Sequence, residues 1–279
     1  MPKVDYGKLL TEQSNPRTKF IDRLPVEKIL ALINQEDQSV PKAVAKAQKQ
    51  IAQAVQLIVG SLKKGGRLFF AGAGTSGRLG VIEAAECPPT FGTSPSLVQA
   101  IMAGGPKAVF HSQEGAEDNS LQALSIFRKK LRNNDVLVGI TASGVTPFVR
   151  GAFQAAREKN VKTILVTCSN IVIEKKLVDC LIAVKTGPEV ISGSTRLKAG
   201  TATKLVLNML TVTSMIQLGK VYQNWMVDLQ PKSKKLEARA LRLISYLGGV
   251  SPKKARVLFL KARKNVKTAL RYRFQMYRV

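Results

Sequence analysis

Long apolar runs and cysteines are both scarce in this sequence of 279 residues. No stretch of about 20 uncharged apolar residues occurs, which argues against a membrane-spanning helix, and the amino-terminal residues lack the apolar centre of a signal peptide. The three cysteines, Cys87, Cys168 and Cys180, are odd in number and far apart, which argues against a disulfide framework or a zinc site. We therefore expect a cytoplasmic protein with reduced thiols, no membrane partner and no bound metal.

Histidine and acidic residues are scarce as well. The single histidine, His111, argues against histidine-based triads and metal clusters, because a lone histidine near a strand end is more often structural than catalytic. Eighteen acidic residues against 44 basic ones give a formal net charge of +26. Residues 232–278 hold 15 of the basic residues and one acidic residue, Glu237, so about half of the excess charge lies there.

This basic segment has two interpretations. Clustered lysines and arginines are the usual electrostatic footprint of nucleic-acid binding. The alternative is a solvated helical surface, which we favour because no aromatic-interleaved or base-reading motif accompanies the basic residues. Nucleic acid is therefore not expected as a partner.

Short apolar runs alternate with helical patterns through the middle of the chain. Apolar residues at helical spacing separate the runs, an order typical of βαβ units and a parallel sheet. We therefore predict an α/β fold with a doubly wound, five-stranded parallel sheet flanked by helices. The expected strands are residues 68–71, 97–102, 136–140, 163–168 and 181–184, and the expected intervening helices are residues 79–86, 120–131 and 147–158.

The remaining segments are predicted to be helical. Helices are expected at residues 40–62, 194–221, 236–247 and 252–269. The last two are basic and amphipathic, and they follow a linker that begins near residue 228. We expect three parts: a helical arm at residues 1–39, the α/β domain at residues 40–228 and a small basic helical domain at residues 229–279.

A glycine-rich turn follows the first expected strand. Residues 72–77 match GxGxxG between a strand and a helix, which is the context of a dinucleotide site. Such a site also needs an acidic residue after the next strand, where residues 103–105 read Ala-Gly-Gly instead. Gly74, Thr75 and Ser76 offer backbone amides and two hydroxyls at a helix start, which suits a polyhydroxylated or phosphorylated ligand.

A second turn of the same kind follows the third expected strand. Residues 141–147 read TASGVTP, in which Ser143, Gly144 and Thr146 are again small or hydroxylated and precede a helix. Two such turns at the carboxyl ends of parallel strands can face one crevice, so a sugar phosphate is the expected ligand. The alternative is that each turn only caps its helix.

A third polar segment begins a later helix. Ser194, Thr195, Arg196 and Lys198 combine hydroxyls with two cations, which is a pattern that can contact a phosphate or a carboxylate. The alternative is a well-capped helix with no ligand.

Several of these segments together carry a family resemblance. GAGTSGRLGVIEAAECPPTFG, AGG…EGAED, ASGVTPFV and SGSTRLKAGTATKLVLNML resemble the signature segments of the N-acetylmuramic acid 6-phosphate etherases, and the resemblance runs from about residue 10 to residue 236. It implies that residues 40–228 form a sugar isomerase (SIS) domain in a cytoplasmic homodimer of bacterial cell-wall amino-sugar recycling. The implied enzyme is a carbon–oxygen lyase without cofactor that converts N-acetylmuramic acid 6-phosphate to N-acetylglucosamine 6-phosphate and D-lactate.

Removal of lactate requires two acid–base groups. In the ring-opened sugar the C2 proton lies beside an aldehyde, so a base can remove it while an acid protonates the departing lactate oxygen, and water then adds. The resemblance makes Glu86 the acid and Glu117 the second catalytic carboxylate, which we expect to act as the base. We expect residues 87–89 to end the helix of Glu86, which would favour its protonated form, and a helix after Glu117 to favour its ionised form.

Other interpretations stay open for these carboxylates. Glu83 and Glu86 share a helix face and could both be solvated, while Glu114, Glu117 and Asp118 could be ordinary acidic residues of a first helical turn.

The sequence also departs from the family pattern. Where many members have an arginine in the second turn, this chain has Val145, so a cation of the family pattern is absent there and the sequence does not predict the ligand affinity. The basic residues 229–279 are expected to form a truncated version of the family's carboxyl-terminal helical domain. The alternative function is a non-catalytic, sugar-phosphate-binding regulatory SIS protein similar to glucokinase regulatory protein, which needs only the two hydroxyl-bearing turns.

Overall fold

The computed structural model describes residues 5, 7, 9–169, 175–229, 231 and 233–274. The chain divides into two compact units. The first comprises residues 1–84 and 96–214, and the second comprises residues 85–95 and 215–279. The three-part division expected from the sequence stays a prediction.

Five parallel strands form the sheet of the first unit, in the order β2-β1-β3-β4-β5. Their bounds are Leu68–Gly72 (β1), Val98–Met102 (β2), Val136–Ile140 (β3), Lys162–Thr167 (β4) and Cys180–Ala183 (β5). The expected five-stranded parallel α/β sheet is confirmed. Because the strand order reverses between β1 and β3, their carboxyl ends form the switch point at which open sheets of this type bind ligands.

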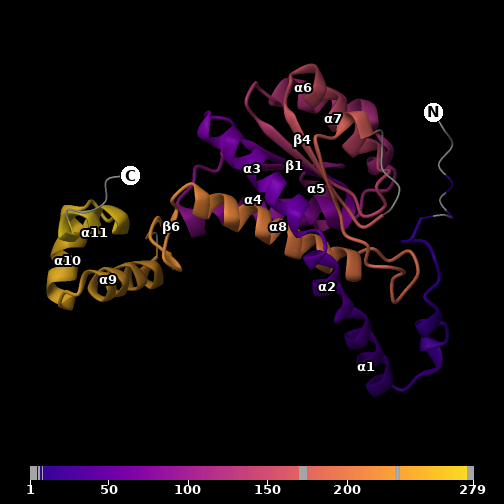
Figure 1. Cartoon of the computed structure of the whole chain (residues 1–279), viewed down its shortest axis with the longest axis horizontal. Helices are drawn as coiled ribbons and strands as arrows, with labels where there is room; N and C mark the ends of the chain where they lie inside the picture. The colour runs from indigo at the N-terminus through magenta and orange to yellow at the C-terminus, as the bar shows by residue number, and fades with distance from the viewer. Residues whose placement is uncertain are drawn as a thin grey trace. The chain divides into compact units, whose positions relative to one another are not determined.

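Helices cover both faces of this sheet (Figure 1). Phe69 packs into the core under α6 (Ser120–Lys130) and α7 (Pro147–Glu158), whereas Phe70 faces α4 (Gly74–Phe91). This alternation follows from the strand geometry, in which successive side chains point to opposite faces. The helix α3 (Gln48–Lys63) also packs on the sheet.

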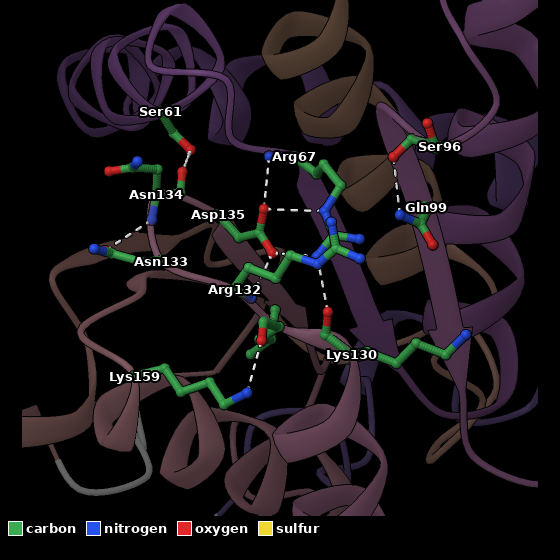
Figure 2. Close-up of polar contacts among 11 residues, drawn as sticks. Ser61, Arg67, Ser96, Gln99, Lys130, Arg132, Asn133, Asn134, Asp135 and Lys159 are labelled. Carbon is green, nitrogen blue, oxygen red and sulfur yellow. Dashed lines mark hydrogen bonds and ion pairs between the residues drawn. The ribbon is translucent and has the colours of Figure 1, made fainter.

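A buried ion pair joins the amino ends of β1 and β3, at the edge opposite the switch point. Arg67 and Asp135 directly precede these strands, and the Arg67 guanidinium lies 2.7 Å from Asp135 Oδ2 (Figure 2). Asp135 also accepts hydrogen bonds from the backbone amides of Arg67 and Arg132, each at 2.8 Å. Its side chain is only 2% exposed, so these bonds replace the water that burial removes.

The expected helix over residues 40–62 is wrong, because the structure has two helices there. The first, α2, spans Ser39–Ala45, and α3 begins at Gln48 after a turn in which the Ala47 amide donates to Val44 O at 2.9 Å. The expected helix 194–221 is shorter than predicted. The first unit also contains α8 (Lys198–Gln217) up to residue 214. Its other elements in the described residues are α1 (Val26–Asp37), α5 (Lys107–Phe110), and the 3-10 helices η2 (Pro16–Thr18), η3 (Ile21–Arg23), η4 (Ala116–Asp118) and η5 (Lys175–Leu177).

The expectation that residues 87–89 end α4 is also wrong. The helix continues through Pro88 and Pro89 to Phe91. Both prolines lack an amide proton, but burial of Phe91 stabilises the last turn, and the Gly92 amide donates to Pro88 O at 3.0 Å. Gly92, with φ +64°, is in the left-handed conformation that commonly ends a helix.

Beyond the end of α8, the described residues of the second unit form a short hairpin and three helices. They are β6 (Val221–Tyr222), β7 (Trp225–Met226), α9 (Lys234–Gly248), α10 (Pro252–Lys261) and α11 (Val266–Phe274). The single helix expected at residues 252–269 is therefore wrong. Arg263 and Lys264 both have positive φ, and the Asn265 side chain accepts from Thr268 N at 2.7 Å, so the chain starts a new helix. Apolar side chains of all three helices, including Leu243, Phe259 and Val266, form one core.

Candidate functional site

The first glycine-rich turn joins β1 to α4 at the switch point. A β-carbon on Gly77 would lie 2.8 Å from Gly72 O, so this turn requires glycine for its close backbone approach. Gly74 begins α4 with φ +53°, again a conformation that favours glycine. Thr75 and Ser76 follow in the first helical turn, half-buried, where backbone amides lack helical partners. The turn can therefore offer amides and hydroxyls to a ligand.

The second turn, between β3 and α7, holds a cluster of hydroxyl groups. Thr141 Oγ1 lies 2.7 Å from Thr146 Oγ1 and 3.2 Å from Ser143 Oγ, and it accepts from the Gly144 amide at 3.1 Å. Gly144 has φ +79°, which permits the sharp turn. Thr146 occupies the N-cap of α7 without a side-chain capping bond. The hydroxyl groups of Ser143 and Thr146 are therefore arranged by Thr141 rather than by the helix.

The first turn of α8 lies beside the turn after β1 and the turn after β3. A β-carbon on Gly200 would lie 3.6 Å from Thr75 Cγ2, which places α8 next to the start of α4. Cys168, after β4, donates from its amide to Ala142 O at 3.1 Å and from its thiol to Ala199 O at 3.7 Å. Three segments expected to contact a ligand are thus brought together at one edge of the sheet.

The segment before α8 differs from its expected role in one respect. Glu189 is 1% exposed and accepts from the amides of Lys198 and Ala199 at 2.8 and 2.9 Å, so a carboxylate already occupies this helix start. The Lys198 ammonium is buried and lies 2.7 Å from Glu36 Oε2. Ser194 and Thr195 are half-buried and Arg196 is exposed, so these three remain candidates for ligand contact.

A cavity of about 140 Å³ lies between the turn after β1 and the segment after β2. Gly74 and Arg78 line it from α4, and Glu114 and Glu117 line it from the segment around η4. Arg78 was not among the site residues expected from the sequence, although it is the next residue after the GxGxxG motif. Its Nε donates to Val109 O at 2.9 Å, which holds the guanidinium at the cavity.

Glu117 is a perturbed carboxylate in this cavity. Glu117 is exposed, but the protein atoms around its carboxyl desolvate it in part and raise its pKa, and the negative charges of Asp118 and Glu114 raise it further. Glu117 precedes a helix as expected, since it lies in η4 before the Asn119 cap of α6, but its raised pKa runs against the expectation that this position favours the ionised form. A raised pKa makes the ionised Glu117 carboxylate a stronger base.

The two glutamates of α4 have different surroundings. Glu83 is 4% exposed, pairs with the Lys204 ammonium and accepts from Thr211 Oγ1 at 2.6 Å, so the interpretation of a solvated Glu83 is wrong. Glu86 is exposed. Since α4 continues for five residues beyond Glu86, the helix-end argument for its protonated form no longer holds.

Other parts of the described chain offer fewer candidates for chemistry. A second cavity of about 240 Å³, lined mostly by apolar atoms of Val221, Tyr222 and Leu270, contains none of the expected site residues. His111 is exposed. Within the described ranges, His, Cys, Asp and Glu side chains form no group of three that could hold a metal ion. In the same ranges, every helix is too short or too polar to cross a bilayer.

Comparison with known proteins identifies the family. The family model of the glucokinase regulatory protein N-terminal SIS domain matches residues 50–157. An N-acetylmuramic acid 6-phosphate etherase of Rippkaea orientalis is 48% identical over 95% of this chain and 87% of that protein. The etherase of Geobacillus thermodenitrificans is 46% identical over 94% of this chain and 89% of that protein. The chain belongs to the N-acetylmuramic acid 6-phosphate etherase family. The resemblance inferred from the sequence is thereby confirmed.

Solved structures support the fold of this etherase-family protein. A putative phosphosugar isomerase involved in capsule formation from Bacteroides fragilis has a TM-score of 0.52 and 21% identity, and the match covers 74% of this chain and 97% of that one. The Vibrio vulnificus NanR protein complexed with ManNAc-6P has a TM-score of 0.50 and 16% identity, over 79% of this chain and 71% of that one. At these identities the match establishes the SIS fold of the etherase-family chain.

Proposed function

We propose that this protein cleaves the D-lactyl ether of N-acetylmuramic acid 6-phosphate, giving N-acetylglucosamine 6-phosphate and D-lactate with net consumption of one water. The single observation that carries the proposal is the identity of 46–48% with etherases over nearly the whole chain. The site geometry supports it, because the hydroxyl-bearing turns and the cavity with Glu117 lie at the carboxyl edge of the same sheet.

The hydroxyl cluster of the second turn is our candidate for the 6-phosphate. Ser143 and Thr146 can donate hydroxyl hydrogens, and Gly144 contributes a compact backbone that lets a phosphate approach. Gly74, Thr75 and Ser76 would contact the sugar, with Ser194, Thr195 and Arg196 on its other side. Arg78 is the cation of the cavity and suits the lactyl carboxylate. Because its ammonium is engaged by Glu36, Lys198 is left out of the proposed contact set.

The proposed reaction is an elimination followed by an addition. Ionised Glu117 removes the C2 proton of the ring-opened sugar, and the C3–oxygen bond breaks as Glu86 protonates the lactate oxygen. Water then adds at C3 of the unsaturated aldehyde, and a proton returns to C2. The raised pKa of Glu117 supports its role as base. The role of Glu86 rests on the family resemblance.

The direct test is incubation with N-acetylmuramic acid 6-phosphate and an enzymatic assay for D-lactate. We expect one D-lactate for each N-acetylglucosamine 6-phosphate formed. A protein that binds the substrate yet releases no lactate would contradict the proposal. That outcome would favour the second candidate, a non-catalytic regulatory protein, which the match to the glucokinase regulatory protein domain supports.

A double substitution tests the phosphate contacts. In Ser143→Ala with Thr146→Ala, N-acetylglucosamine 6-phosphate should bind at least about tenfold more weakly, since hydrogen bonds to charged groups contribute about 1.5–3 kcal/mol each. Isothermal titration calorimetry measures the dissociation constant. Unphosphorylated N-acetylglucosamine serves as the control ligand, and its affinity should change little. Unchanged affinity for the phosphorylated sugar would assign the phosphate to another turn.

A homodimer is the proposed assembly, and it is supported by exposed apolar side chains on neighbouring helices. Ile82 on α4 is 45% exposed, and Met209 and Val212 on α8 are 42% and 43% exposed. Burying such a patch against a second copy would remove apolar surface from water.

The proposed compartment of the reaction is the cytoplasm, where buried thiols such as those of Cys168 and Cys180 stay reduced.

Light scattering after size-exclusion chromatography tests this assembly. We expect the wild-type protein to have twice the mass of one chain, and Met209→Glu with Val212→Glu to shift it to a monomer because two charges would be desolvated at the interface. Leu121→Glu is the matched control, since Leu121 is 78% exposed on α6. A dimer that survives the double substitution would place the interface elsewhere.

A further inference from the structure

A buried ionic cluster connects the amino-terminal segment to the start of α8. Glu36 Oε2 lies 2.7 Å from the Lys198 ammonium, and both side chains are at most 1% exposed. Glu36 also accepts from Asn15 Nδ2 at 2.9 Å and pairs with Arg17 at 2.5 Å. Burial alone would raise the pKa of Glu36, but the hydrogen bonds from Lys198, Arg17 and Asn15 outweigh it and lower the pKa. Glu36 is therefore a buried, ionised carboxylate, and of its partners Arg17 is 64% exposed.

The same amino-terminal segment holds the loop that precedes α8. Thr18 Oγ1 donates to Val190 O at 2.8 Å, and the Gly193 amide donates to Thr11 O at 3.0 Å. These two bonds bracket the loop just before Ser194 and Thr195. At the other end of the loop, Lys198 is fixed by Glu36 through its side chain and by Glu189 through its amide.

The location of this ion pair indicates what it does. Removing two charges from water is costly, so a buried ion pair contributes little net stability compared with apolar residues of the same volume. What it does provide is a fixed geometry, because each charge can satisfy its partner in only a narrow range of positions. Here that geometry sets the first turn of α8, which lies beside Thr75.

We propose that Glu36 is a positioning residue for substrate binding: by holding Lys198 and Asn15 at one buried point, it fixes the loop with Ser194 and Thr195 against the sugar site. This inference rests on the proposed function. It makes the amino-terminal segment part of the binding site, and it gives Lys198 a supporting role in place of a substrate contact.

The substitution Glu36→Gln tests the inference, since it keeps the shape of the side chain and removes its charge. We expect the KM for N-acetylmuramic acid 6-phosphate and the dissociation constant for N-acetylglucosamine 6-phosphate to rise roughly tenfold to a hundredfold. A misplacement of binding groups by about 1 Å can have an effect of about a hundredfold. The kcat should fall by a smaller factor, because Glu86 and Glu117 lie on other elements.

Asp135→Asn is the matched control. Asp135 is also a buried, ion-paired carboxylate, but it pairs with Arg67 at the amino ends of the strands (Figure 2). This variant should lower the midpoint of thermal unfolding about as much as Glu36→Gln does, while the KM and the dissociation constant stay at their wild-type values. If both variants lose stability and neither changes ligand affinity, Glu36 is only structural and the inference is overturned.

A second variant decides the question if Glu36→Gln does not fold. Replacing both charges, with Glu36→Met and Lys198→Met, removes the ion pair as a unit, and the buried Glu189 keeps its bonds from the two backbone amides, so the variant should fold. We expect it to bind N-acetylglucosamine 6-phosphate at least about tenfold more weakly, because methionine side chains do not fix the loop. Wild-type affinity would overturn the inference. A wild-type protein that releases no lactate would instead contradict the proposed function, while calorimetry with the product still tests the positioning role.

Discussion

Glu117→Gln is expected to abolish both D-lactate release and the exchange of the C2 proton of N-acetylglucosamine 6-phosphate with deuterated water. Both processes need a base at C2, and glutamine cannot accept the proton. The loss should be roughly a hundredfold to ten-thousandfold, the usual contribution of a positioned acid or base. Coupled spectrophotometry follows lactate, and proton NMR follows the C2 signal. Full exchange in this variant would move the base to Glu114 or Asp118.

The pH profile supplies a matched control for this assignment. Glu117 must be ionised to act, so activity should fall as the pH falls through its pKa, which burial, Asp118 and Glu114 raise above the ordinary glutamate value. Glu114→Gln removes one of the like charges from the same cavity, so it should keep most activity and shift the acidic limb to lower pH. If the acidic limb of Glu114→Gln stays at the wild-type pH, a group other than Glu117 governs that limb.

The strands were predictable because most of them are buried on both faces. Every residue of β1 and β3 is buried, and strands of that kind read as continuous apolar runs bounded by turns. The end of α4 was not predictable by the same reasoning. Pro88 and Pro89 favour termination locally, yet burial of Phe91 and the Gly92 cap carry the helix past them. Local preference gave way to tertiary packing at that point.

The candidate site shows the same division between local and distant interactions. The two turns were predictable, because hydroxyls and glycines next to a strand end carry a local signal. The burial and pairing of Lys198 were not predictable, since its partner Glu36 lies 162 residues earlier in the chain. A lysine at a helix start is equally typical of a ligand contact and of a buried pair. Only the fold distinguishes them.

Glu86→Gln is expected to separate the two halves of the reaction. If Glu86 only protonates the departing lactate oxygen, this variant should lose lactate release by roughly a hundredfold to ten-thousandfold and keep measurable C2 exchange, because removal of the C2 proton does not need the acid. Glu117→Gln should lose both signals, so the two variants differ in one NMR experiment. The comparison does not depend on the stability of the variants, since lactate release and C2 exchange are measured on the same variant and compared with each other.

The leaving group provides the sharper test of Glu86. Fluoride departs without protonation, so an analogue with fluorine in place of the lactyl group at C3 should restore elimination in Glu86→Gln and leave Glu117→Gln inactive. Fluoride release is followed with an ion-selective electrode. Undiminished lactate release by Glu86→Gln on the natural substrate would make Glu86 an ordinary exposed residue of α4, in keeping with its accessible position. The departing oxygen would then take its proton from water or from another group of the site.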